Sequence, residues 1–169
     1  MPISSVLNYL QGLLDGLPMP GGLDNMNAFA VPPPDPYVET TTPTVFIWPT
    51  DFDEARDTSK GGSSMPRNTG PGTFSGVKMF THEPHLFIMW MAANDDPSFP
   101  GIVDFVMKAL RFAYPMPTIV TDPNDGTQSQ INDVGEVQRG QIYVRALEDE
   151  AWNRYDAELI VPVIEEISA

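Results

Sequence analysis

The alternation of hydrophobic and polar positions predicts a strand at the centre of the fold, over residues 85–91. An extended chain would place apolar side chains on both of its faces there. Such a strand needs cover on both sides, from helices on one face and from a partner or a second layer on the other. One face would carry Leu86, Ile88 and Trp90, and the other would carry Phe87, Met89 and Met91.

Apolar residues recur at helical spacing in two segments, which predicts two helices. The first follows Ser4 or Ser5, either of which can cap it, and stops at Gly16 and Pro18. The second spans residues 99–112 and has Ser98 as its cap. Each helix has an apolar stripe that must pack on the sheet. The stripes consist of Val6, Leu7, Leu10, Leu13, Leu14 and Leu17 in the first helix, and Ile102, Val103, Val106, Ala109 and Leu110 in the second.

The remaining strands follow a period of two. Residues 44–48 predict a short strand, and residues 77–91 predict either a hairpin or, as we favour, one long strand bent at Pro84. Residues 141–147 and 155–164 predict a terminal antiparallel pair. Together the elements predict an α+β fold, a two-layer sandwich of a mainly antiparallel sheet with two helices packed on one face, in a single domain over residues 1–169.

Two insertions interrupt this pattern. Residues 18–43 hold seven of the eighteen prolines, which favours an extended arm over the surface, with Met26, Phe29 and Tyr37 as anchors. The alternative is a proline-rich ligand for an aromatic groove. Residues 50–75 combine glycine, serine and charged residues with little apolar area, which predicts a mobile loop.

The net charge of −14 is the main feature of the composition. No Lys or Arg precedes Arg56, and residues 122–169 carry eleven acids against three arginines. A protein that grips nucleic acid needs clustered cations, so we do not expect DNA to bind the surface at large. The acids serve either solubility or a surface along which DNA slides without sticking. The chain has no cysteine, and its sequence predicts neither a signal peptide nor a membrane span.

No motif for catalysis, metal binding or cofactor binding stands out. His82 and His85 are three residues apart, which in a strand places them on opposite faces, so we do not expect them to share a metal. Residues 122–126 resemble the start of a calcium loop, but the glycine comes one place early and no glutamate stands at the twelfth position, so we predict a turn. Trp48 and Trp90 have apolar strand neighbours and are expected to anchor either the core or an interface.

The order of these elements resembles the tail terminator proteins of long-tailed bacteriophages, and several segments are similar to versions from phages of actinobacteria. The likeness covers residues 76–165 and extends to the first 75 residues only in outline; the arm at 18–43 is longer than the minimal family pattern. The similar segments are His85 to Trp90, Asn94 to Pro97, Phe99 to Asp104, Thr121 to Pro123, Gly126 to Gln130, Tyr155 to Ala157 and Val161 to Val163.

The resemblance implies a structural protein of the virion tail or neck, made in the cytoplasm of the host bacterium, without enzymatic activity, cofactor or membrane contact. Such proteins form a ring, typically a hexamer, that caps the tail tube, ends its polymerisation and joins it to the head connector. DNA passes through the ring without specific binding. The alternatives are a head-closure or tail-tube component, a small carboxylate-dependent hydrolase, and a peptide-binding adaptor that uses the arm.

A ring closes through one repeated head-to-tail contact, which needs two different patches on each chain. Arg56, Lys60 and Arg67 give the loop at 50–75 three of the nine cations, and the acidic C-terminal half is their expected partner. Each such rim charge contributes about 1 kcal/mol or less, so apolar contacts along strand edges must supply most of the affinity. The expected interface residues are therefore Arg56, Lys60, Arg67, Trp48 and Trp90.

Overall fold

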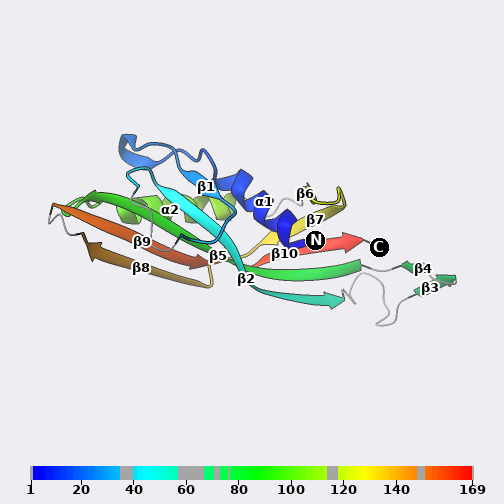
Figure 1. The fold of residues 1–169 in the computed structure, drawn as a ribbon. Helices are drawn as coiled ribbons and strands as arrows, with labels where there is room; N and C mark the ends of the chain where they lie inside the picture. The colour runs from blue at the N-terminus through cyan, green and yellow to red at the C-terminus, as the bar shows by residue number, and fades with distance from the viewer. Residues whose placement is uncertain are drawn as a thin grey trace.

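A computed structural model describes residues 2–34, 40–56, 67–70, 73–75, 77–113, 118–147 and 151–168. It has a mixed α+β fold in which two helices lie on one face of a mostly antiparallel sheet (Figure 1). The predicted fold class is therefore confirmed.

The strand β5 (Val77–Ala93) is the centre of the sheet. Along one edge it pairs with β2 (Thr44–Arg56) over the whole length of β2. Along the other edge, β10 (Val163–Ser168) pairs with the first half of β5 and β9 (Trp152–Ile160) pairs with the second half. The sheet therefore divides into two branches beyond β5. Because β5 continues through Pro84, the prediction of one long bent strand is confirmed over the hairpin.

Each branch carries further strands. β8 (Arg139–Ala146) pairs with β9, so the predicted terminal antiparallel pair is confirmed. β7 (Gln128–Val134) pairs with β10, and β6 (Thr118–Thr121) pairs with β7. β1 (Asn27–Phe29) adds a short parallel strand to the start of β2, while β3 (Arg67–Gly70) and β4 (Thr73–Ser75) form a separate two-stranded sheet.

The two branches separate at Pro162. The prediction of one strand over residues 155–164 is wrong at this point, because residues 161–162 divide it into β9 and β10. Gly135 packs against the break and donates its N–H to the Pro162 carbonyl oxygen at 2.8 Å. A Cβ on residue 135 would lie 2.6 Å from Pro162 Cγ, so a side chain there would displace the proline.

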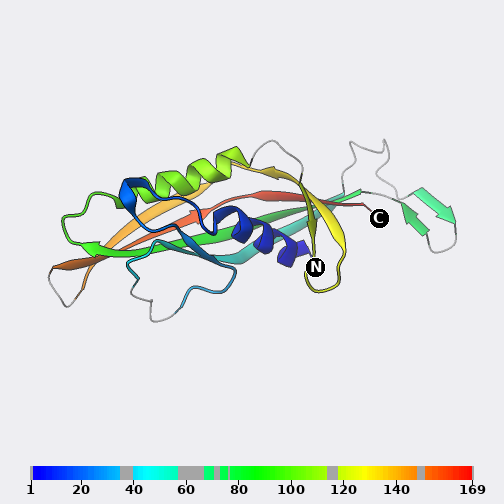
Figure 2. The ribbon, with the colours of Figure 1, turned by 90° about the horizontal axis from the view of Figure 1, so that it is seen from above.

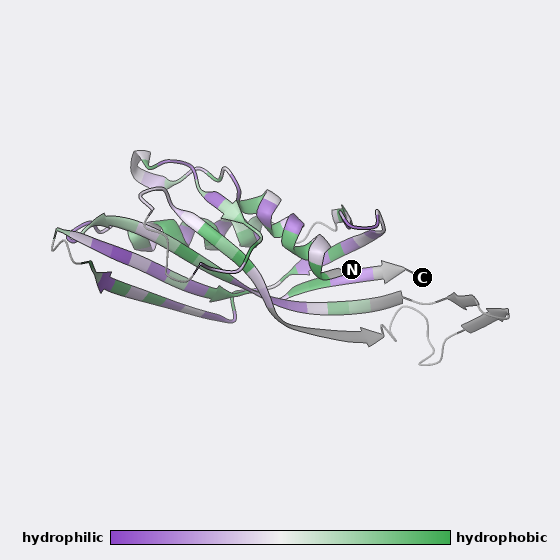
Figure 3. Ribbon diagram, in the orientation of Figure 1, coloured by the Kyte–Doolittle hydropathy of each residue, from purple (hydrophilic) through white to green (hydrophobic). Residues whose placement is uncertain are grey.

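Both helices cover the same face of the sheet (Figures 1 and 2). α1 (Pro2–Leu14) buries Val6, Leu10 and Leu14 on that face. α2 (Phe99–Phe112) buries Phe99, which stacks on Trp90 of β5 with 6.3 Å between the ring centroids. Polar and apolar positions alternate along β8 and β9 (Figure 3). The apolar stripes predicted for the two helices are confirmed except for Leu17, which lies beyond the end of α1; the buried members are Val6, Leu10, Leu14, Ile102, Val103, Val106 and Leu110.

The insertions contain more regular structure than predicted. Residues 50–56 continue β2, because they pair with β5, and the loop therefore does not begin at residue 50. Residues 57–66 lie outside the described residues, and the mobility of this segment stays a prediction. In the arm at 18–43, the 3-10 turn η1 (Pro20–Gly22) and β1 add order. Met26 is buried as predicted, the Phe29 ring stacks on Phe46, and Tyr37 lies outside the described residues.

Ser98 precedes α2, but its side chain makes no capping hydrogen bond. Instead, Asp96 Oδ1 accepts the Ser98 N–H at 2.9 Å and holds the turn that leads into the helix. Pro100 stands in the first turn of the helix, where the N–H that proline lacks has no partner within the helix.

Candidate functional site: the outer face of the sheet

The face of the sheet opposite to the helices is the most distinctive surface of the molecule, and we call it the outer face. The pairing of adjacent strands shows which residues are neighbours across this face: Phe29, Phe46 and Phe87 lie side by side on β1, β2 and β5. The next row joins Trp48 to His85. In the part of the chain that the structure describes, no helix packs on this face.

Aromatic side chains dominate the β1, β2 and β5 part of the outer face. Phe29 and Phe46 stack with 5.8 Å between ring centroids. Phe29 is 44% exposed and Trp48 is 38% exposed, while Phe46 of β2 and Met89 of β5 are buried. Exposed aromatics that adjoin buried apolar residues form a contiguous patch, and such patches mark contact surfaces.

Charged side chains occupy the β9 and β8 part of the same face. His85 Nδ1 lies 2.7 Å from Glu158 Oε1. Asp156 Oδ2 lies 3.1 Å from Arg154 Nε and 3.9 Å from Arg145 Nε. Because Asp156 is buried and its Oδ1 has no hydrogen-bond partner within the described ranges, this carboxylate has a free acceptor. The outer face is thus an aromatic patch with a charged rim, the composition of a protein contact surface.

Two shallow hollows follow the boundary between the aromatic and charged parts. The larger, of about 220 Å³, lies beside Phe87, Met89, Tyr143 and Asp156. The smaller, of about 160 Å³, lies beside His85, Tyr143 and Glu158. Each hollow has room for roughly one large side chain. Both are therefore suited to a single side chain of a protein partner more than to a drug-sized ligand.

The expected interface residues fall in three different environments. Trp48 lies on the outer face, where it is accessible to a partner. Trp90 is 2% exposed and its indole N–H donates to the Thr41 carbonyl oxygen at 3.0 Å, so it anchors the core and does not reach a partner. Arg56 and Arg67 stand in β2 and β3, with side chains outside the described part, and Lys60 lies outside the described residues altogether.

A largely buried cluster joins a serine, a glutamate and a histidine, and no local sequence pattern indicates it because these residues are distant along the chain. Glu165 is fully buried, and its Oε2 lies 3.0 Å from His82 Nε2. Its Oε1 accepts the Ser129 hydroxyl. The glutamate lies between the other two, and no hydrogen bond joins Ser129 to His82. A histidine must contact a serine to activate it, so this order does not provide a nucleophile, and the cluster satisfies buried polar groups.

His82 and His85 lie on opposite faces of β5, as predicted: His82 belongs to the buried cluster and His85 to the outer face. Among the described residues, no group of three histidine or acidic side chains is placed to hold a metal ion. Residues 122–126 form a turn, as predicted, closed by the hydrogen bond from the Gly126 N–H to the Asp122 carbonyl oxygen at 2.9 Å. The side-chain and backbone hydrogen bonds from Thr127 hold the pKa of Asp125 below its usual range.

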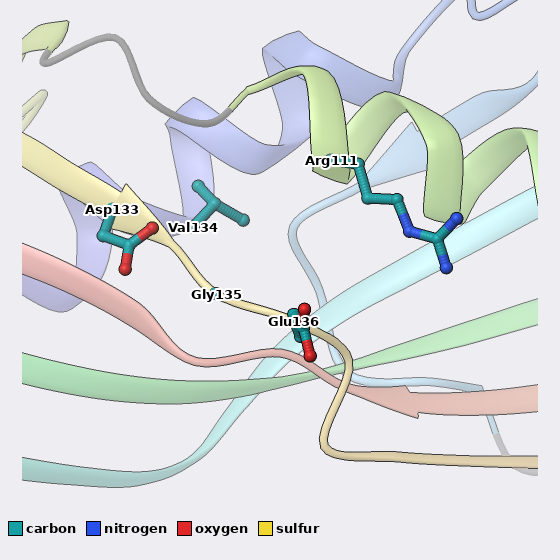
Figure 4. Close-up of a pocket in the computed structure, with 5 residues that line it drawn as sticks. All are labelled: Arg111, Asp133, Val134, Gly135 and Glu136. Carbon is teal, nitrogen blue, oxygen red and sulfur yellow. The ribbon is translucent and has the colours of Figure 1, made fainter.

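A hollow of about 390 Å³ lies between α2 and the end of β7 (Figure 4). Arg111 reaches it from the helix, and Asp133 and Glu136 reach it from the opposite wall. Figure 4 shows the Arg111 guanidinium well separated from the Asp133 carboxylate, and the lining groups do not converge on one point. This hollow therefore lacks the arrangement of an acid–base pair.

The chain matches no family model, and no curated protein matches it. Within the described residues, no helix is long and apolar enough to cross a membrane.

Proposed function

We propose that this protein is a structural component of the neck of a long-tailed bacteriophage, a tail terminator. It forms a ring of six copies, the number typical of that family, that caps the tail tube, ends tube polymerisation and joins the tail to the head connector. Its partners are further copies of itself, the tail tube protein and the head–tail connector protein. It acts by assembly and turns over no substrate.

One observation carries this proposal: the central strand is apolar on both faces, and the helices cover only one of them. Leu86, Ile88 and Trp90 of β5 are buried beneath the helix layer, whereas Phe87 and Met91 lie half-buried on the outer face. Burial of one large apolar side chain stabilises a contact by about 1.5–3 kcal/mol, and an exposed ion pair contributes about 1 kcal/mol or less. The aromatic patch, more than the charged rim, is therefore suited to hold subunits together.

The charge of the chain supports the same function. With 23 acids against nine cations, the surface repels phosphate, so a ring of these subunits would let DNA pass through its centre without gripping it. A head-closure or tail-tube component of the same virion would share this property. Those alternatives differ in what the protein binds: a terminator adds to the end of a finished tube and stops its growth.

The test compares two exposed aromatic residues on opposite sides of the molecule. Trp48→Glu places a charge on the outer face, and Phe112→Glu places the same charge on α2, where Phe112 is 75% exposed. A phage that carries Trp48→Glu is expected to produce tails of irregular length or heads without tails, because the charge would be desolvated in the subunit contact. The measurement is electron microscopy of lysates.

The Phe112→Glu phage serves as the matched control and is expected to produce normal particles. Both substitutions affect exposed positions, so the two monomers should have the melting temperature of the wild type. Normal infectious particles from the Trp48→Glu phage would show that the outer face is not the assembly surface.

A further inference from the structure

β8 is an edge strand that the helix layer does not protect. All eight of its residues are exposed, on both faces of the strand. Ile142 and Val144 continue the helix-side face of β9, where Ala157 and Tyr155 are buried, but Ile142 is 48% exposed and Val144 is 58% exposed. Among the described strands β9 alone pairs with β8, and an exposed edge strand with apolar side chains at its middle is a template for pairing with another strand.

A second open edge occurs on the opposite side of the large sheet. β1 pairs with β2 only at residues 44–46, so in the described part of the chain residues 47–56 have β5 as their single neighbour. Residues 51–56 pair with β5 in regular register beyond the irregularity at Pro49. The other outermost strands of this sheet, β1 and β6, are only three and four residues long. Among the described strands of this sheet, length therefore singles out β8 and residues 51–56 as the substantial open edges.

The sequences of these two edges are complementary in charge. β8 holds Arg139 and Arg145 and no acid. Residues 51–56 read Asp-Phe-Asp-Glu-Ala-Arg, with three acids and one arginine. Two copies of β8 side by side would bring arginines together, and two copies of the β2 edge would bring acids together, whereas β8 beside the β2 edge joins opposite charges.

We infer that β8 of one copy pairs with residues 51–56 of β2 in the next copy, so that the sheet continues from subunit to subunit. This inference rests on the proposed ring function and names the contact that builds the ring. Because the two edges are different strands, the contact is head-to-tail, and it generates a closed ring when the rotation between copies closes. Backbone hydrogen bonds between the two edges add to the affinity that the apolar contacts supply, and the charges select the partner edge over a like one.

The test uses matched substitutions on two edge strands. Val144→Glu and Ile119→Glu each put one acid in place of an exposed apolar residue, since Val144 on β8 is 58% exposed and Ile119 on β6 is 61% exposed. Val144→Glu is expected to raise the dissociation constant of self-assembly about tenfold or more, because it faces an acidic edge. Ile119→Glu is expected to leave it within about twofold of the wild type. Mass photometry and light scattering over a concentration series measure both.

Two further measurements identify the partner edge. Val144→Lys loses the same apolar contact as Val144→Glu but gains the favourable charge, so it should assemble more tightly than Val144→Glu. Hydrogen exchange should slow in residues 139–146 and 51–56 together as the oligomer forms, while residues 118–121 of β6 keep their exchange rates. Circular dichroism and melting temperatures check that all three variants remain folded.

Three results would overturn the inference: equal assembly of the Val144→Glu and Ile119→Glu variants, equal assembly of the Val144→Glu and Val144→Lys variants, or unchanged exchange at residues 51–56 in the oligomer. A wild-type protein that stays monomeric at every concentration would also overturn it. The proposed function would survive that last result if the same monomer still capped tail tubes, because assembly would then require the tube. Failure to cap tubes would instead contradict the proposed function.

Discussion

At the scale of single residues, Glu165 is a buried carboxylate whose removal should destabilise the fold. Its two carboxylate oxygens satisfy Ser129 and His82 at once; Glu165 and His82 are buried, and Ser129 is half-buried. We expect Glu165→Ala to lower the free energy of unfolding by about 3 kcal/mol, because it leaves the buried His82 and the half-buried Ser129 without their partner. Urea denaturation followed by circular dichroism measures the loss.

The neighbouring Glu166 gives the control for this prediction. Its carboxylate accepts a hydrogen bond from Asn132 Nδ2 at 2.7 Å, but the residue is only half-buried. Glu166→Ala should cost about 1 kcal/mol or less, since water can reach the Asn132 amide. Equal losses for the two variants would show that Glu165 is not held in the closed environment described above.

Residue identities predicted some of these environments and missed others. The period of a strand places His82 and His85 on opposite faces, and that placement is confirmed. The partners of both histidines, Glu165 and Glu158, lie on strands far along the chain, so local spacing carries no information about them. Trp48 and Trp90 have equally apolar neighbours, and only the position of the helix layer decides that one is exposed and the other is core.

At the scale of elements, α2 has one face that is committed to the core. Val106 is fully buried, whereas Lys108, two residues later, is exposed and lies over the Phe112 ring. Val106→Asp should therefore lower the free energy of unfolding by several kcal/mol, roughly 3 or more, because it buries an unpaired carboxylate. Lys108→Ala should change it by less than about 0.5 kcal/mol. Thermal melts of both variants measure the difference, and equal melting temperatures would mean that the helix faces the other way.

Strand existence could be predicted from the sequence better than strand length. The apolar run at 44–48 identified β2, but the charged residues after Pro49 gave no periodic signal, and their strand structure comes from pairing with β5. The alternation over 155–164 is continuous, so it conceals the division at Pro162, which depends on the close approach of Gly135. The division of the sheet into two branches is likewise a tertiary property that no local pattern contains.

At the scale of the whole molecule, the uncovered outer face and the open edges point to a chain that is completed by its neighbours. The sequence predicted that β5 needs cover on both faces, and the structure shows that its own helices cover one. It also predicted cations of the loop at 50–75 as the electrostatic side of the contact. Two other arginines, Arg139 and Arg145, lie on the edge strand β8, and the inferred pairing makes residues 51–56 of β2 the acidic side of the contact in place of the C-terminal half.

The most direct test of the central claim, that this protein assembles at the end of a tail tube and stops its growth, is polymerisation of purified tail tube protein with and without it. Tube length over time and the appearance of the tube ends are measured by negative-stain electron microscopy. The account predicts a ring of this protein at one end of each tube and no further elongation from that end. Tubes that keep growing with bare ends, while the added protein stays monomeric, would contradict it.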